Sequence, residues 1–296
     1  MSRTAAGLRR DTSARLAEVA RQRPEWHGWI DLLEVARQAM DGGLWAVTLA
    51  PGDTSAGASR REPLLHNRAL RVDAGRAQRL IEDLAFNAAE MEGGRSLRRL
   101  CLSRADSLAL ISAAITENTH IIGLLATQQE ADAAALDSLG HMAALPLLQA
   151  CRQQLQSLLP QRWSESYCPI CAAWPVLAER RGLDRSRRLR CGRCATDWEV
   201  EWLYCIYCGE RDHRKLGSLS PDESGEMLKV ETCDTCHSYL KSVASLQGFQ
   251  PLELLLQDLE TVELDLVALQ RGYNRPQQSA FPLTFQLSDD ASGAGL

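Results

Sequence analysis

The chain has 296 residues, of which 24% are charged, and its formal net charge is −5 at pH 7. This length allows about two domains with cores of their own, and the negative balance speaks against a general nucleic-acid-binding surface. Eighteen consecutive apolar residues do not occur, so we predict no membrane insertion. The twin arginine at Arg9-Arg10 is followed by polar residues, which does not fit an export signal, and we therefore expect a cytoplasmic protein.

The first half of the chain shows helical spacing of its apolar residues. This periodicity predicts helices in residues 12–40 (interrupted at Pro24), 72–92, 104–126 and 130–159. Residues 51–62 are rich in Gly, Ser, Pro and Arg, which predicts a mobile loop. Together these patterns predict an all-α helical domain over residues 1–163.

This helical half offers little chemistry. Glu117 and His120 have helical (i, i+3) spacing, but neither a carboxylate nor a further histidine completes a metal motif around them. Cys101 and Cys151 stand alone, and we expect them to be buried as small hydrophobic side chains. A helical domain of this kind usually holds a partner or the neighbouring domain.

The second half is organised around four copies of the motif Cys-x-x-Cys. A Cys-x-x-Cys turn brings two sulfurs to one point, and two facing turns give the four thiolates that a borderline divalent metal prefers. Eight of the ten cysteines lie in these pairs, and we predict them to be metal ligands: Cys168, Cys171, Cys191, Cys194, Cys205, Cys208, Cys233 and Cys236.

The spacing between the pairs favours two metal sites in sequence. Nineteen residues separate the first pair from the second, twenty-four separate the third from the fourth, and only ten lie between the second and the third. The simplest arrangement joins pairs one and two around one metal and pairs three and four around another. An interleaved arrangement, first with third and second with fourth, stays open.

Two other interpretations of the cysteines fit less well. Disulfides require an oxidising compartment, which no part of the sequence indicates. A thioredoxin-type redox pair needs a single Cys-x-x-Cys, whereas four in series are typical of metal sites.

The cysteine pairs are embedded in short predicted strands. Residues 176–179 and 187–190 form a hairpin between the first two pairs, and residues 197–202 alternate as a third strand. The predicted fold is therefore α+β and multidomain: the helical domain precedes two small zinc-ribbon metal modules, over residues 164–204 and 205–248, and a C-terminal helix follows.

Arginines crowd the first predicted hairpin. One interpretation is a surface that binds an acidic partner or nucleic acid, and the other is a solvated strand edge on which charge discourages pairing. These candidate partner-binding residues are Arg180, Arg181, Arg185, Arg187, Arg188 and Arg190.

The last segment, residues 249–296, is predicted to be one amphipathic helix and a tail. Pro251 suits the first turn of a helix over residues 251–271, and Gly272 suits its C-terminal end. From Gln277 onward the composition predicts a disordered tail.

The order of these motifs resembles the FdhE-type formate dehydrogenase accessory proteins. The resemblance covers nearly the whole length and is most specific from Cys168 to Lys241, where four Cys-x-x-Cys pairs are combined with the run Thr232-Cys-Asp-Thr-Cys-His-Ser-Tyr-Leu-Lys241. In the helical half the chain shares the helical character of these proteins more than any specific motif.

This resemblance implies a cytoplasmic assembly factor and not an enzyme. It implies binding to the catalytic subunit of a respiratory formate dehydrogenase, and rubredoxin-like sites in which the eight cysteines hold two metal ions. The resemblance makes iron the preferred metal. Zinc stays as the alternative, because both metals fit a tetrahedral thiolate shell. One-electron exchange at iron, or metal-stabilised docking of the client, is the implied chemistry.

Two other classes of function remain as alternatives. A zinc-ribbon nucleic-acid-binding protein is favoured by the hairpin arginines and opposed by the net charge of −5. A thiol–disulfide or electron-transfer enzyme would require reactive cysteines without metal. The oligomeric state, including a homodimer, stays open.

Overall fold

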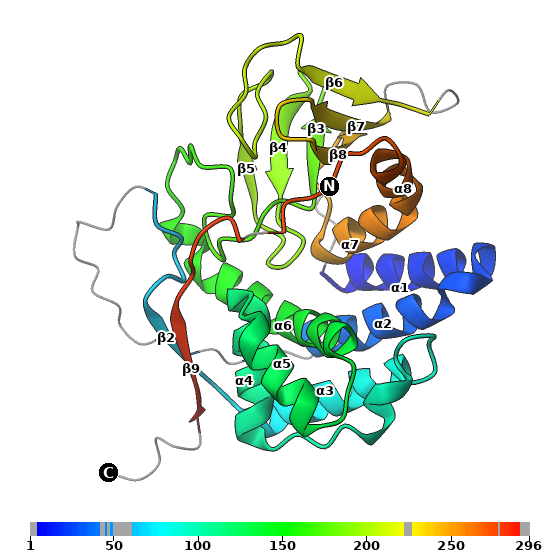
Figure 1. The fold of residues 1–296 in the computed structure, drawn as a ribbon, viewed down its shortest axis with the longest axis vertical. Coiled ribbons are helices and arrows are strands. Elements are labelled where there is room, and N and C mark those ends of the chain that lie inside the picture. The colour runs from blue at the N-terminus through cyan, green and yellow to red at the C-terminus, as the bar shows by residue number, and fades with distance from the viewer. Residues whose placement is uncertain are drawn as a thin grey trace. The chain divides into compact units, whose positions relative to one another are not determined.

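A computed structural model gives the structure of the chain (Figure 1) and describes residues 5–41, 45, 48–49, 61–221, 227–277 and 279–290. The chain divides into two compact units. Unit 1 comprises Met1–Ser55, Leu65–Gln154 and Leu283–Leu296, and unit 2 comprises Ala56–Leu64 and Leu155–Pro282. Most of the loop predicted over residues 51–62 lies outside the described residues. Among the residues that are described, no helix is both long and apolar enough to cross a membrane.

Unit 1 is mainly helical, as the apolar periodicity predicts. Its helices and 3-10 turns are α1 (Ala5–Gln22), η1 (Pro24–Trp26), α2 (His27–Asp41), α3 (Ala74–Ala88), η2 (Arg95–Arg99), α4 (Arg104–Thr116), α5 (Thr119–Gln128) and α6 (Ala133–Leu155). Helix α3 contacts both α2 and α4, and α4 contacts α5. Fully buried side chains such as Leu84 of α3 and Ile111 of α4 form the core.

The predicted long helix over residues 104–126 is wrong in one respect, because it is two helices. Glu117 lies in the left-handed region at φ 56° and ends α4, and Asn118 begins α5 by accepting a hydrogen bond from the Ile121 N–H at 3.2 Å. A residue in the left-handed conformation ends a helix, and an Asn N-cap directly after it begins the next one.

Unit 1 is not all-α, because it contains a small sheet in the order β1-β2-β9. Strand β2 (Arg68–Val72) pairs antiparallel with β1 (Thr48–Leu49) and parallel with β9 (Phe285–Asp289). The predicted disordered tail is therefore wrong for residues 285–289. Asp289 also accepts a hydrogen bond at 3.2 Å from the Ala74 N–H at the start of α3, so this strand is held by a helix N-terminus as well. Residues 278 and 291–296 of the predicted tail lie outside the described residues.

Unit 2 is built on one six-stranded sheet in the order β5-β4-β3-β8-β7-β6 (Figure 1). The strands are β3 (Leu177–Arg181), β4 (Ser186–Arg190), β5 (Asp197–Glu199), β6 (Leu216–Leu219), β7 (Leu228–Cys233) and β8 (Ser238–Ser245). A short 3-10 turn, η3 (Gln156–Leu158), precedes them.

The two predicted ribbons share this sheet. Each ribbon supplies three antiparallel strands, and the parallel pairing of β3 with β8, from Leu177↔Lys241 to Arg181↔Ser245, joins them. The picture of two separate small modules is therefore too simple: β3 and β8 are central strands, and backbone hydrogen bonds connect the two halves.

The predicted C-terminal helix is also two helices, α7 (Pro251–Glu260) and α8 (Val262–Gln270). The hydroxyl of Thr261 donates to the carbonyl of Gln257 at 2.7 Å, a side-chain bond that commonly bends a helix, and the break follows there. Leu254 of α7 packs with Leu177 and Val243, and Leu264 of α8 packs with Val230, so both helices cover the sheet.

Candidate metal centres

The four Cys-x-x-Cys motifs fold into the same type of turn. In the first, the Cys168 N–H donates to the carbonyl of Ala173 at 2.9 Å and the Ala172 N–H donates to the carbonyl of Cys168 at 3.0 Å. The second and third motifs repeat these two bonds at Cys191 and Cys205. The residue after each second cysteine has a positive φ: Ala172 (64°), Ala195 (60°), Gly209 (77°) and His237 (52°).

These left-handed residues carry strain at three of the four turns, since only Gly209 lacks a Cβ. Such strain persists where the surrounding structure requires it, and here it turns the backbone so that both sulfurs of a motif face the same side. The local geometry therefore indicates that the turns exist to present sulfur atoms.

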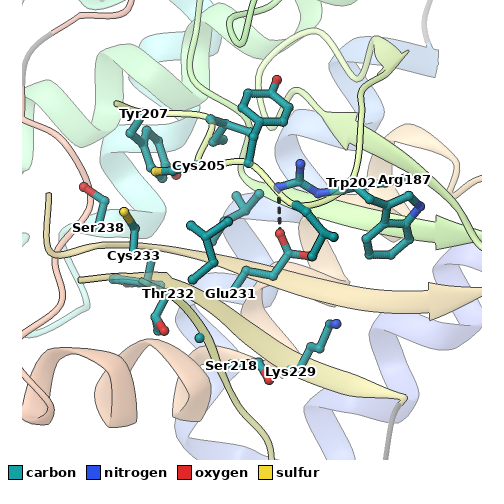
Figure 2. A pocket seen from close by; sticks show the side chains of 17 residues that line it. Arg187, Trp202, Cys205, Tyr207, Ser218, Lys229, Glu231, Thr232, Cys233 and Ser238 are labelled. Carbon is teal, nitrogen blue, oxygen red and sulfur yellow. Dashed lines mark hydrogen bonds and ion pairs between the residues drawn. The ribbon is translucent and has the colours of Figure 1, made fainter. Parts of the chain in front are cut away.

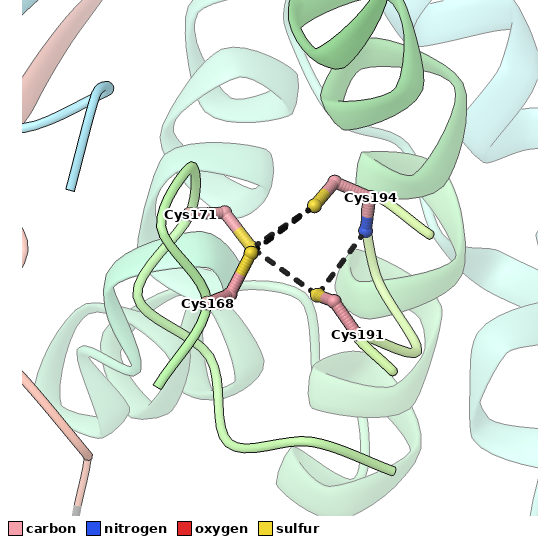
Figure 3. Close-up of side chains that lie close together, drawn as sticks. All are labelled: Cys168, Cys171, Cys191 and Cys194. Carbon is pink, nitrogen blue, oxygen red and sulfur yellow. Dashed lines mark hydrogen bonds between the residues drawn. The ribbon is translucent and has the colours of Figure 1, made fainter. Parts of the chain in front are cut away.

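The eight sulfurs gather in two groups of four. The first cysteine group is Cys168, Cys171, Cys191 and Cys194 (Figure 3), and the second cysteine group is Cys205, Cys208, Cys233 and Cys236. Within each group all four sulfurs lie within 4.8 Å of one another. The grouping is sequential and not interleaved.

The spacing of the sulfurs fits a tetrahedral metal ion. In the first group Cys168 lies 3.4 Å from Cys194 and Cys171 lies 3.4 Å from Cys191. In the second group Cys205 lies 3.6 Å from Cys236 and Cys208 lies 3.7 Å from Cys233. A tetrahedron with metal–sulfur bonds of about 2.3 Å has sulfur–sulfur edges of about 3.8 Å. All ten cysteines are free thiols, so the short separations are not disulfides.

Donor groups point at the sulfurs as they do around metal thiolates. The Ile170 N–H lies 3.4 Å from the Cys168 sulfur and the Cys194 N–H lies 3.4 Å from the Cys191 sulfur. The Thr196 hydroxyl lies 3.1 Å from the Cys194 sulfur. Such donors favour the charged thiolate, which is the form that binds metal.

Burial opposes ionisation of the metal-free thiols. Desolvation raises the pKa of Cys168 well above its ordinary value and also raises the pKa of Cys205, whereas the pKa of Cys191 is held well below its ordinary value, despite burial, by hydrogen bonds from the neighbouring cysteines. At neutral pH the sulfurs of Cys168 and Cys205 are therefore protonated until a metal displaces the protons.

The zinc affinity of the full chain should consequently rise with pH. Each proton that zinc displaces lowers the apparent affinity about tenfold for every pH unit of acidification in the range where the thiols are protonated. A competition titration with a chromophoric chelator at pH 6, 7 and 8 measures this, with the affinity of the chelator alone determined at each pH as the control. An affinity independent of pH would show that the thiols are already ionised without metal.

The hairpin arginines are largely interior and do not form the predicted surface patch. Arg180, Arg187 and Arg190 are at most 4% exposed, and their strands, β3 and β4, both lie in the interior of the strand order. Glu179, which is fully buried, accepts hydrogen bonds from Arg190 and Arg181.

Arg187 and Arg188 also pair with carboxylates, and Arg185 lies at the turn. Arg187 pairs with Glu231 at 2.7 Å, and Arg188 pairs with Asp197 at 2.6 Å. Although burial acts to raise it, the neighbouring Arg188 holds the pKa of Asp197 below its ordinary value. Among these six arginines, all in the described part of the chain, only Arg185 is exposed.

Sequence reasoning missed the acidic partners of these arginines. Glu179 looked like an ordinary member of a charged strand, and Glu231 lies 44 positions from Arg187. The first four residues of β3 are all buried. The sequence could not predict this, because the strand is rich in arginine and its neighbours in the sheet were unknown. Of the two lone cysteines, Cys151 is buried as predicted, whereas Cys101 is exposed and that prediction is wrong.

The chain is similar in sequence to proteins of one known family. Residues 203–281, which contain the whole second cysteine group, match the family described as FdhE, C-terminal domain. A protein FdhE homolog of Stutzerimonas stutzeri is 37% identical over 120 residues, covering 40% of this chain and 38% of the relative. Protein FdhE of Escherichia coli K12 is 31% identical over 150 residues, covering 47% of this chain and 46% of the relative. The matched stretches thus span less than half of the length of these relatives.

The solved crystal structure of the FdhE protein from Pseudomonas aeruginosa has a similar fold. The TM-score is 0.60 at 21% sequence identity, and the superposition covers 96% of this chain and 98% of that one. The resemblance indicated by the cysteine motifs is therefore confirmed: residues 203–281 match the C-terminal domain of the FdhE family, and the chain as a whole has the fold of a solved FdhE protein.

Proposed function

We propose that the chain is an accessory protein required for the assembly or activation of a respiratory formate dehydrogenase. It binds the catalytic subunit of that enzyme in the cytoplasm and carries two tetrathiolate metal sites. The observation that carries the proposal is that one complete four-cysteine group lies within the stretch that matches the FdhE C-terminal domain. The FdhE relatives over just under half of the chain support it.

The eight cysteines of the two groups are the proposed metal ligands, with iron preferred and zinc as the alternative. A bound iron ion would supply one-electron exchange at a tetrathiolate shell, and a bound zinc ion would supply order alone. The chain itself holds the sulfurs near tetrahedral spacing and directs N–H and hydroxyl groups at them.

The same donor sets support a role other than catalysis. Each group offers four sulfur ligands, which leaves a tetrahedral ion without an open position for water or substrate. Hydrolysis or group transfer at these centres is therefore not part of the proposal, and the function lies in binding a client.

A nucleic-acid-binding function is not retained as a second candidate. It depended on a basic surface at the first hairpin, and Arg180, Arg187 and Arg190 are buried there. A buried guanidinium cannot neutralise a phosphate without unfolding the strand that carries it.

Association with the client is the decisive experiment. The tagged full chain is expected to retain the catalytic subunit of a respiratory formate dehydrogenase when both are produced together without oxygen, because the FdhE-like fold is proposed to bind it. An unrelated folded protein of similar size serves as the control bait. Retention equal to that of the control, with and without oxygen, would contradict the proposed function.

One variant tests the remaining surface of the hairpin. Arg185→Ala changes an exposed side chain at the turn and leaves the buried arginines intact. If the hairpin binds the client, this variant should retain less of it while keeping wild-type solubility and metal content. Undiminished retention would place the binding surface elsewhere on the chain.

A further inference from the structure

The two cysteine groups differ in their access to solvent. In the first group every cysteine is at most 1% exposed. In the second group Cys205 and Cys233 are buried, whereas Cys208 is exposed and Cys236 is partly exposed. The fold therefore repeats the same turn in a closed setting and in an open one.

The closed setting of the first group is built from side chains of unit 2. Ala195, which follows Cys194, belongs to a buried cluster with Leu177 and Leu254. Thr196 is buried against the Cys194 sulfur, and Trp198 is 4% exposed. An incoming ligand could reach these sulfurs only after this packing had opened.

The second group is open at Cys208 and borders a cavity. Besides the exposed Cys208, a cavity of about 220 Å³ is lined by Cys205 and Cys233 together with aromatic side chains such as Trp202 (Figure 2). Figure 2 shows the sulfurs of Cys205 and Cys233 at one end of this cavity. A small molecule can therefore approach the second group without disturbing the core.

One side-chain contact ties the two turns of the second group together at its open side. The Glu210 carboxylate, two residues after Cys208, accepts hydrogen bonds at 2.9 Å from the N–H groups of Arg211 and Asp212. Its other oxygen accepts a bond at 2.7 Å from the hydroxyl of Thr235, which lies between Cys233 and Cys236. This Glu210–Thr235 bond connects the turns independently of any metal.

From these contrasts we propose that the first group is a fixed structural centre, and that the second group is an exchangeable centre entered at Cys208. The proposal rests on the metal content proposed above. Cys208 would be the first of the four ligands to give way: a donor atom of an entering ligand would take the place of its sulfur, and the freed thiolate would take a proton from the buffer. The Glu210–Thr235 bond slows this step because it holds the two turns together.

The test uses the full chain loaded with zinc. After two zinc ions per chain have been verified, the protein is mixed with the chromophoric chelator 4-(2-pyridylazo)resorcinol and with iodoacetamide, and the alkylated peptides are identified over time. We expect one zinc per chain to leave at least about tenfold faster than the other, because local opening is easier where few buried contacts must break. Cys208 and Cys236 should be alkylated in the fast phase, while Cys168, Cys171, Cys191 and Cys194 stay protected.

The outcomes separate this inference from the proposed function. Two zinc ions leaving in one phase, or alkylation of the first group before the second, would overturn the inference and leave the client-binding proposal intact. A chain that takes up no zinc and no iron would overturn both. Loss of client binding with two-phase release would overturn the proposed function alone.

A pair of variants tests the Glu210–Thr235 bond. Thr235→Val removes the hydroxyl and should speed the fast phase several-fold without changing the slow phase. Thr235→Ser keeps the hydroxyl and should restore the wild-type rate. Equal rates for the two variants would show that this bond does not hold the second centre.

Discussion

Replacing Cys191 by serine is expected to yield a chain that is insoluble or rapidly cut by proteases across residues 164–248. Metal binding contributes about 10–16 kcal/mol in zinc-finger peptides at neutral pH, and in small metal modules that free energy goes into folding. Cys191 follows β4 directly and belongs to the fully buried first group, so its loss removes the tetrahedral shell and exposes a core cluster. Limited proteolysis with mass spectrometry of the fragments measures the effect.

Cys101→Ser is the matched control for this substitution. Cys101 is exposed and is not part of either four-cysteine group, so its replacement should leave proteolysis and metal content unchanged. A Cys191→Ser chain as resistant as the control, with its metal content intact, would show that the first group does not hold the fold together.

Replacing Lys241 by methionine is expected to lower the free energy of unfolding by about 3–5 kcal/mol, the usual loss when one partner of a buried ion pair is removed. Lys241 lies in the central strand β8 and is fully buried. Its ammonium pairs with Asp258 at 2.5 Å and with Asp265 at 2.7 Å, and so joins β8 to both α7 and α8. Methionine keeps most of the volume but leaves these carboxylates with Arg275 as their cation. Urea unfolding of the metal-loaded chain at pH 7 measures the loss.

Arg211→Ala provides the comparison on the surface. Arg211 pairs with Glu201 at 2.9 Å, but the two side chains are 66% and 71% exposed. An exposed pair of this kind typically contributes less than about 1 kcal/mol. If Lys241→Met destabilised the chain no more than Arg211→Ala, the buried cluster would not be what holds α7 and α8 to the sheet.

Structural features that depend on nearby residues could be predicted from local sequence patterns. The helix of residues 74–88 follows from apolar spacing, and the sequential cysteine grouping follows from the number of residues between the pairs. The turn at each Cys-x-x-Cys motif is formed by hydrogen bonds between residues a few positions apart. These features could be predicted because the interactions that cause them span a few residues or one hairpin.

Features that depend on distant partners could not be predicted. The burial of Arg187 requires Glu231 on another strand, and the central position of β3 requires pairing with β8, whose residues lie 64 positions further along the chain. An arginine-rich strand is usually exposed, because burying a charge is unfavourable without a paired partner. The sequence shows each charge but not the pairing.

Some features that were predicted wrongly, such as the two helix breaks, do have a local signal in the sequence. Glu117-Asn118-Thr119 contains a good N-cap in the middle of an apparently continuous helix, and Thr261 interrupts the final helix with a hydroxyl. The strand at residues 285–289 alternates between half-buried and exposed positions, a weak pattern that polar composition concealed. Its pairing partner at residues 68–72 has two buried apolar side chains, Leu70 and Val72.

The parallel pairing of β2 with β9 also has a consequence for synthesis. Paired residues of the two strands, such as Arg68 and Phe285, are 217 positions apart, so the small sheet of unit 1 cannot close until residue 289 has left the ribosome. At about 5–20 residues per second, the N-terminal helices exist for about 10 to 40 s before their last strand arrives. The last cysteine of the two groups, Cys236, precedes Phe285 by 49 positions, so both groups are synthesised about 2 to 10 s before the last strand of unit 1 arrives. If the two groups bind metal as proposed, the order of translation gives them a short time to do so before the sheet of unit 1 is complete.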